Sequence, residues 1–142
     1  MRKPVEIIEG DKSLRLNLYI IIASFILLVI SVEPVIDFVL LRIFEQNTPV
    51  LIEYINKIKL VVSTLIYTII GLIPAFYASW FGYRVVASSK LPPVFLSGKT
   101  RFPFTVVVIK GKYAKMFGFL IIFVSVVLII ELILYASKVI IL

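Results

Sequence analysis

The chain has 142 residues, of which 61% are hydrophobic, and it carries a formal net charge of +7. This hydrophobic share exceeds the roughly 45–50% of soluble domains and indicates an integral membrane protein with a single membrane domain. The sequence contains no cysteine and no histidine, which excludes disulfides, thiolate zinc sites and imidazole catalysis within this chain.

Three apolar segments each exceed the roughly 20 residues that a helix needs to cross the hydrocarbon core of a bilayer. None shows the alternating polarity of a membrane barrel strand, so the predicted fold is all-α, with three transmembrane helices. In chain order the predicted elements are an N-terminal segment (1–15), the first helix (16–41), an external loop (42–59), the second helix (60–83), a cytoplasmic loop (84–115), the third helix (116–137) and an external C-terminus (138–142).

Two carboxylates, Glu33 and Asp37, flank Pro34 near the end of the first predicted helix. Counted from Arg15 at about 1.5 Å per residue, Glu33 lies about 27 Å along the helix, at the outer edge of the hydrocarbon, and Asp37 about 33 Å along it, at the interface. Because proline removes a backbone donor, we expect a kink or a helix end here. The favoured interpretation is that this pair marks where the helix leaves the membrane, where carboxylates cost less than at mid-bilayer.

Small residues recur along the second predicted helix at alternating spacings of four and three, which places them on one continuous seam. In lipid, close packing through small residues drives helices together, so we predict a helix-packing interface, either within this chain or with a partner subunit. The interface comprises Thr64, Thr68, Gly71, Ala75, Ala78 and Gly82. Trp80 and Tyr83, next to Arg84, fit the aromatic belt at the cytoplasmic interface.

The loop after the second helix contains bases and no acids, which predicts that this loop and the N-terminus are cytoplasmic and that the C-terminus is external. Its prolines and glycines predict an ordered loop with turns, and residues 104–109 predict a short strand that pairs back on the loop or with a partner's sheet. The bases also suit contact with anionic phospholipid headgroups or a partner. They are Arg84, Lys90, Lys99, Arg101, Lys110, Lys112 and Lys115.

Glu131 is the carboxylate that the sequence embeds most deeply, about 23 Å beyond Met116 on the third helix. A lone ionised carboxylate facing lipid is costly, so we expect it to face the bundle, to bind a cation or to be protonated. We predict a polar cluster near the outer face, with structural pairing or partner contact favoured over ion or proton transport. Its members are Glu33, Glu131 and one or more of Lys57, Lys59 and Lys138.

The residue types predict a protein that is not an enzyme and needs no cofactor or metal, because no set of catalytic side chains shares an inferable site. The first hypothesis is a non-catalytic accessory or assembly subunit of a larger complex in the bacterial inner membrane, which binds other integral membrane proteins and phospholipids. Nucleic acid is not expected, since the charge follows from topology. The alternatives are a homo-oligomeric ion or proton conduit that uses Glu131 and, third, an immunity-type protein that blocks a toxin within the membrane.

Overall fold

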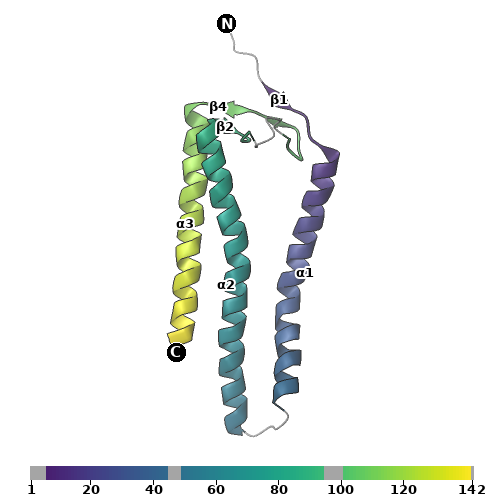
Figure 1. The fold of residues 1–142 in the computed structure, drawn as a ribbon, viewed down its shortest axis with the longest axis vertical. Helices are drawn as coiled ribbons and strands as arrows, with labels where there is room; N and C mark the ends of the chain where they lie inside the picture. The colour runs from purple at the N-terminus through teal and green to yellow at the C-terminus, as the bar shows by residue number, and fades with distance from the viewer. Residues whose placement is uncertain (1–5, 45–48, 95–100, 142) are drawn as a thin grey trace.

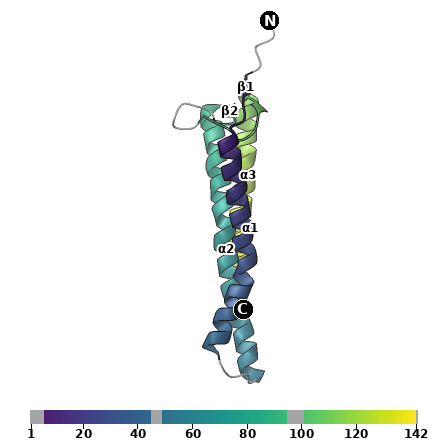
Figure 2. The ribbon, with the colours of Figure 1, turned by 90° about the vertical axis from the view of Figure 1, so that its right-hand side faces the viewer.

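The computed structural model describes residues 6–44, 49–94 and 101–141. These residues form three helices, α1 (Lys12–Ile43), α2 (Pro49–Ser88) and α3 (Lys112–Ile141), which lie side by side in a thin layer with α2 in the middle (Figures 1 and 2). Each helix is long and apolar enough to cross a membrane, which confirms the prediction of three helices of spanning length.

The helix α1 begins four residues before the predicted span and does not end at Pro34. The Asp11 carboxylate caps its first turn by accepting hydrogen bonds from the backbone N–H groups of Ser13 and Leu14, at 2.9 and 3.4 Å. The helix then continues through Pro34 to Ile43, so a helix end at this proline is ruled out. A proline removes only one of the many backbone bonds of a long helix, and the flanking turns carry the helix past it.

The helix α2 is longer than predicted at both ends. It begins at Pro49, so most of the segment assigned to an external loop over 42–59 is helical, and it ends at Ser88 rather than at residue 83. Proline is favoured in the first turn of a helix, where its missing N–H would have no partner anyway. The helix α3 likewise begins at Lys112, before the predicted start at residue 116. Both helices therefore extend beyond the apolar spans from which they were predicted.

The three helices pack unequally. In α1 the buried residues are Val32, Ile36 and Leu40, which pack against α2 close to the connection between the two helices. Towards its N-terminus α1 diverges from α2 (Figure 1), and residues such as Leu16 and Leu27 are 60% and 69% exposed. No Cα atoms of α1 and α3 lie within 8 Å of each other in the described residues. The N-terminal half of α1 therefore stands apart from the α2–α3 pair.

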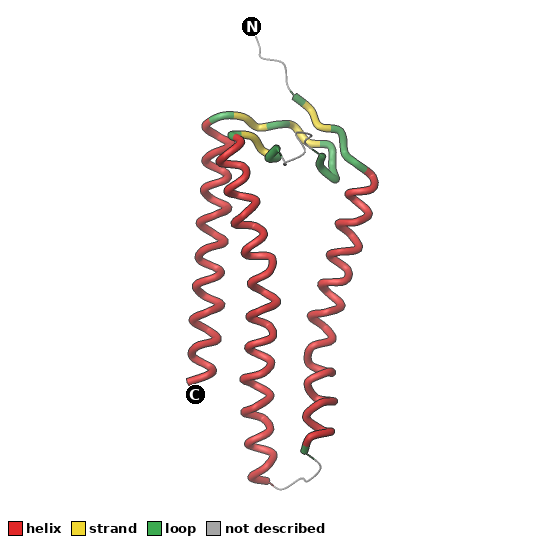
Figure 3. The backbone as a smooth tube through the Cα atoms, in the orientation of Figure 1, coloured by secondary structure: helices red, strands yellow, loops and turns green. Residues whose placement is uncertain are grey.

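Four two-residue strands lie at the other end of the helices, which we call the strand end (Figure 3). The strand β1 (Ile7–Ile8) pairs antiparallel with β3 (Val106–Val107), and β2 (Lys90–Leu91) pairs antiparallel with β4 (Ile109–Lys110). The stretch in which the sequence predicts one strand thus contributes to two pairings. One of them joins the N-terminal segment to the α2–α3 loop, a pairing that the sequence analysis did not include.

Candidate functional site

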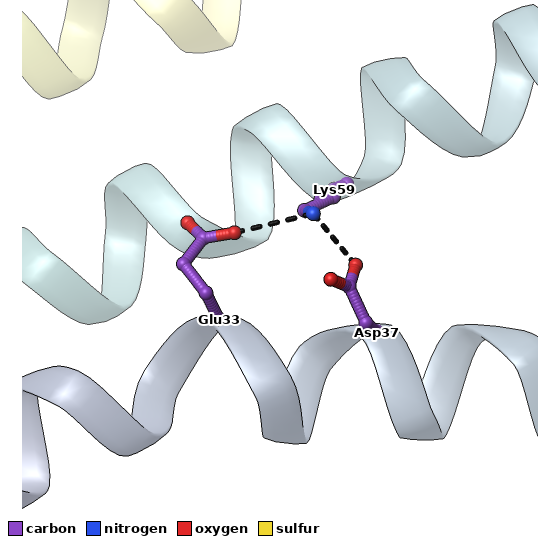
Figure 4. A network of polar contacts seen from close by, with 3 residues as sticks. All are labelled: Glu33, Asp37 and Lys59. Carbon is purple, nitrogen blue, oxygen red and sulfur yellow. Dashed lines mark ion pairs between the residues drawn. The ribbon is translucent and has the colours of Figure 1, made fainter.

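A charge network links α1 to α2 near the end of the bundle that lies away from the strands. The Lys59 Nζ lies 3.2 Å from Glu33 Oε2 and 2.6 Å from Asp37 Oδ1 (Figure 4). Glu33 and Asp37 are four residues apart and therefore share one face of α1, so a single lysine reaches both. Two carboxylates and one ammonium leave a formal excess of one negative charge in this network.

The network overlaps with the predicted polar cluster but has a different membership. Glu33 and Lys59 come together, and Asp37, which the sequence analysis assigned to the helix exit, joins them. Glu131, Lys57 and Lys138 are exposed and form no ion pair with any other described residue. The four-residue spacing of Glu33 and Asp37, opposite a lysine on the next helix, is the signal that could have identified the third member.

Helix rotation explains the position of Glu131. Its neighbour Leu132 faces α2, because the Leu132 side chain lies 3.1 Å from where a Cβ on Gly71 would be. Successive residues are rotated by about 100° around a helix, so Glu131 lies on the flank of α3 and not on its α2-facing side. The carboxylate that the sequence embeds most deeply is therefore exposed on the outside of this three-helix layer.

Beside the charge network, all three helices contribute to a pocket of about 300 Å³, which we call the three-helix pocket and whose mainly apolar walls carry a few polar groups. Its lining residues are Glu33, Leu60, Ser63, Thr64, Tyr67, Thr68, Leu132 and Tyr135. Ser63 is 8% exposed, and its hydroxyl has no hydrogen-bond partner in the described residues. The Thr68 hydroxyl, by contrast, donates to the Thr64 carbonyl at 2.7 Å. A buried hydroxyl without a hydrogen-bond partner lowers the stability of a fold by about 1–3 kcal/mol, so a hydrogen bond to Ser63 from another molecule would be favourable.

The small-residue seam of α2 packs against α3 of the same chain. A Cβ on Gly82 would lie 2.8 Å from the Gly118 carbonyl oxygen, so the two backbones approach more closely than side chains would allow. At Gly71 the nearest atom is the end of the Leu132 side chain. Thr64, Thr68 and Ala75 are buried, and Ala78 is half-buried. The seam thus serves packing within the chain, which leaves less of it for a partner subunit.

Part of the same seam borders an apolar cavity of about 520 Å³ between α2 and α3. It is lined by Gly71, Pro74, Ala75, Ala78, Leu120, Ile121, Val124, Ser125, Leu128 and Leu132. The hydroxyl of Ser125 donates to the Ile121 carbonyl at 2.7 Å and is therefore already engaged. The cavity offers hydrocarbon walls and suits a lipid acyl chain better than a polar ligand.

The bases of the α2–α3 loop have different surroundings. The Arg84 guanidinium donates to the Val94 carbonyl at 3.1 Å and lies 5.9 Å from the centre of the Trp80 ring. Lys110 pairs with Glu6 next to β1, and its hydrogen bond lowers the pKa of the Glu6 carboxyl. Lys90 lies in β2, while Arg101, Lys112 and Lys115 are exposed and Lys99 lies outside the described residues.

The N-terminal segment is bound to the loop by several contacts that the sequence analysis missed. The Asp11 N–H donates to the Phe102 carbonyl at 2.9 Å, and the Gly10 N–H donates to the Thr105 hydroxyl at 3.1 Å. The Arg15 Nε donates to the Pro103 carbonyl at 3.1 Å. These contacts join residues about 90 positions apart in the chain. They fix the start of α1 at the strand end, away from the start of α3.

Within the described residues, no three Asp or Glu side chains gather in a way that could hold a metal ion. The charge network and the three-helix pocket are therefore the candidate site, formed by polar groups within otherwise apolar helices. No protein-family model, curated protein or solved structure matches this chain.

Proposed function

We propose that this chain is a small, non-catalytic accessory or assembly subunit of a larger complex in the bacterial inner membrane. The observation that supports this function best is the presence of exposed polar side chains on the N-terminal half of α1. That half has no neighbouring helix in the described chain, yet it carries Asn17 and Ser24, exposed and with no side-chain hydrogen bond to any described residue. Together with Ser31, whose hydroxyl already donates to the Leu27 carbonyl at 2.7 Å, they recur every seven residues and share one helix face.

Polar side chains on an unpaired membrane helix favour association with another helix. Apolar exposure alone carries no such argument, because lipid covers it as well as protein does. Asn and Ser side chains, however, gain hydrogen bonds across a helix interface that hydrocarbon cannot supply, worth about 0.6–2 kcal/mol each. The face defined by Asn17, Ser24 and Ser31 is accordingly where we place the partner's transmembrane helix.

Two further features favour a hetero-complex. Both ends of α1 are fixed, at the strand end by the contacts of Gly10, Asp11 and Arg15 and at the other end by the packing around Ile36. The position of α1 is therefore set by contacts at both of its ends, so a partner helix can pack on its exposed face without moving it. Glu131, exposed on α3, is a second group that a partner's cation or hydrogen-bond donor would stabilise.

In the proposed orientation the strand end is cytoplasmic. The N-terminal segment and the basic α2–α3 loop share this end, and the excess of lysine and arginine there agrees with the positive-inside rule. The exposed bases Arg101, Lys112 and Lys115 then lie close to anionic headgroups, which attract each of them by about 1 kcal/mol.

Site-specific crosslinking in native membranes tests this proposal, because the chain has no cysteine of its own. The variant Ser24→Cys places a reactive thiol on the polar face, and Ile26→Cys, two residues on, places a matched one on nearly the opposite side of α1. We expect one adduct of defined mass with Ser24→Cys and little with Ile26→Cys. The same membrane protein should co-purify with the unmodified chain in fixed ratio.

Extraction of the chain as a lone monomer, with no adduct from either variant, would contradict the proposal. Extraction as a defined oligomer of this chain alone would instead favour the conduit. In that case ion flux into liposomes should depend on Glu131, the exposed carboxylate of α3, and should fall in Glu131→Gln.

A further inference from the structure

We propose that the three-helix pocket binds an organic ammonium group, the cationic head of a small amphiphile. The inference is independent of whether the chain has a partner protein. It rests on three properties of the pocket: its charge, its unpaired hydroxyl, and the combination of aromatic and aliphatic walls.

The charge of the site calls for one more cation. Glu33 lines the pocket and belongs to the network in which Lys59 alone faces two carboxylates. Only Oε2 of Glu33 engages Lys59, and the other carboxylate oxygen points away from the lysine (Figure 4). The side chains of Glu33 and Asp37 are 44% and 50% exposed, so the excess negative charge is accessible to a further cation. A monocation beside the free oxygen would neutralise the site, whereas an anion would add to the excess.

The buried hydroxyl of Ser63 is an independent sign of a missing ligand. Several serines and threonines within these helices donate to the carbonyl four residues earlier, as Thr68 and Ser125 do at 2.7 Å. Ser63 makes no such bond, although its oxygen is buried and it lines the same pocket as Glu33. Its lone pairs are available to accept a hydrogen bond from an N–H donor placed between the two residues.

The walls and the size favour an organic cation over a bare ion. The pocket volume of about 300 Å³ is roughly ten times the 30 Å³ that one water occupies in the liquid, which exceeds what a single ion needs. Tyr67 and Tyr135 provide aromatic rings, whose faces attract ammonium groups, and Leu60 and Leu132 provide contact for carbon substituents. An alkylammonium group meets each of these surfaces at once.

Such a group has two sources, the ethanolamine headgroup of a membrane lipid or a free amine. Both are tested with the full chain in nanodiscs of phosphatidylglycerol, which contains no amine. One arm titrates n-hexylammonium, with n-hexanol as the uncharged control, and records heat by calorimetry. The other arm adds phosphatidylethanolamine and counts the lipids retained on the protein by native mass spectrometry.

Three variants test whether n-hexylammonium binds in the three-helix pocket. Ser63→Ala leaves the charge network intact and should weaken n-hexylammonium binding about tenfold, the value of one buried hydrogen bond to a charged group. Glu33→Gln should abolish saturable binding, while Glu131→Gln, which removes an exposed carboxylate outside the pocket, should leave it unchanged. Selective retention of one phosphatidylethanolamine, lost in Ser63→Ala and in Glu33→Gln, would identify the lipid as the ligand. Saturable amine binding without lipid retention would identify a free amine.

The proposal fails if neither amine binds saturably, or if n-hexanol binds as well as n-hexylammonium. It also fails if Glu33→Gln and Glu131→Gln reduce binding equally, because the effect would then reflect net charge and not the pocket. Since Ser63→Ala removes a single oxygen and no charge, an unchanged affinity in that variant would overturn the assignment even if Glu33→Gln disturbed the helix packing.

Discussion

The close approach of α2 and α3 predicts a large difference between two glycine substitutions. In Gly118→Ala the new methyl group would lie 2.8 Å from the Gly82 carbonyl oxygen and 2.7 Å from the Val86 side chain. A backbone oxygen cannot move without shifting its helix. In Gly71→Ala the nearest atom, at 3.1 Å, is the end of the Leu132 side chain, which can rotate away beside the apolar cavity.

The expected magnitudes follow from two opposing effects. Overpacking costs about 1–3 kcal/mol, whereas alanine gains up to about 1 kcal/mol over glycine within a helix. Gly118→Ala should therefore lower the free energy of unfolding by about 1–2 kcal/mol. Gly71→Ala should be neutral or stabilising by up to about 1 kcal/mol. Gly118→Val should be the least stable of the three variants, because valine is larger than alanine and has a lower helix propensity.

Unfolding by sodium dodecyl sulfate in mixed micelles measures these differences. Trp80 is the sole tryptophan of the chain and lies in α2, so its fluorescence follows the overall unfolding of the helices. Equal destabilisation by Gly71→Ala and Gly118→Ala would refute the reasoning, since it would show that α2 and α3 are no closer together at Gly118 than at Gly71. A Gly118→Val protein as stable as the wild type would show that the two helices do not pack through this position.

Three further predictions concern the strand end and the charge network. Gly10→Val should detach β1 while leaving the helices intact, because the Cβ of the new side chain would lie 2.8 Å from the backbone of the α2–α3 loop. The expected result is faster amide hydrogen exchange in β1 and β3 with unchanged helical circular dichroism. Lys59→Met leaves two carboxylates unpaired and should lower the stability measured in the same detergent titration. Lys57→Met, which removes a lysine outside the network, should have little effect. The ion pair with Lys110 lowers the pKa of the Glu6 carboxyl, so this pair stabilises the β1 contact fully at pH values above the pKa of the unfolded carboxyl, about 4.3. The stabilisation is lost as the pH falls through the lower pKa of the folded state. NMR chemical shifts in β1 should follow this titration, and Glu6→Gln should remove their pH dependence.

The sequence by itself determined the helical architecture. Long apolar runs permit only structures that satisfy their own backbone in lipid, and this requirement acts locally, within each segment. The seam from Thr64 to Gly82 was likewise visible, because its members share a helix face through spacing alone. The predicted bounds were less accurate, since α1, α2 and α3 begin at Lys12, Pro49 and Lys112, before the apolar spans that hydropathy identifies.

The tertiary structure decided which polar groups meet. Glu33 and Asp37 reach Lys59, while Glu131 does not, because the rotation of each helix about its axis is set by packing such as that of Leu132 against Gly71. The pairing of β1 with β3 joins segments about 100 residues apart, and two-residue strands leave no periodic signal in the sequence. Depth along a helix is a local property that can be counted, whereas the direction in which a side chain points depends on contacts between helices that only the assembled fold provides.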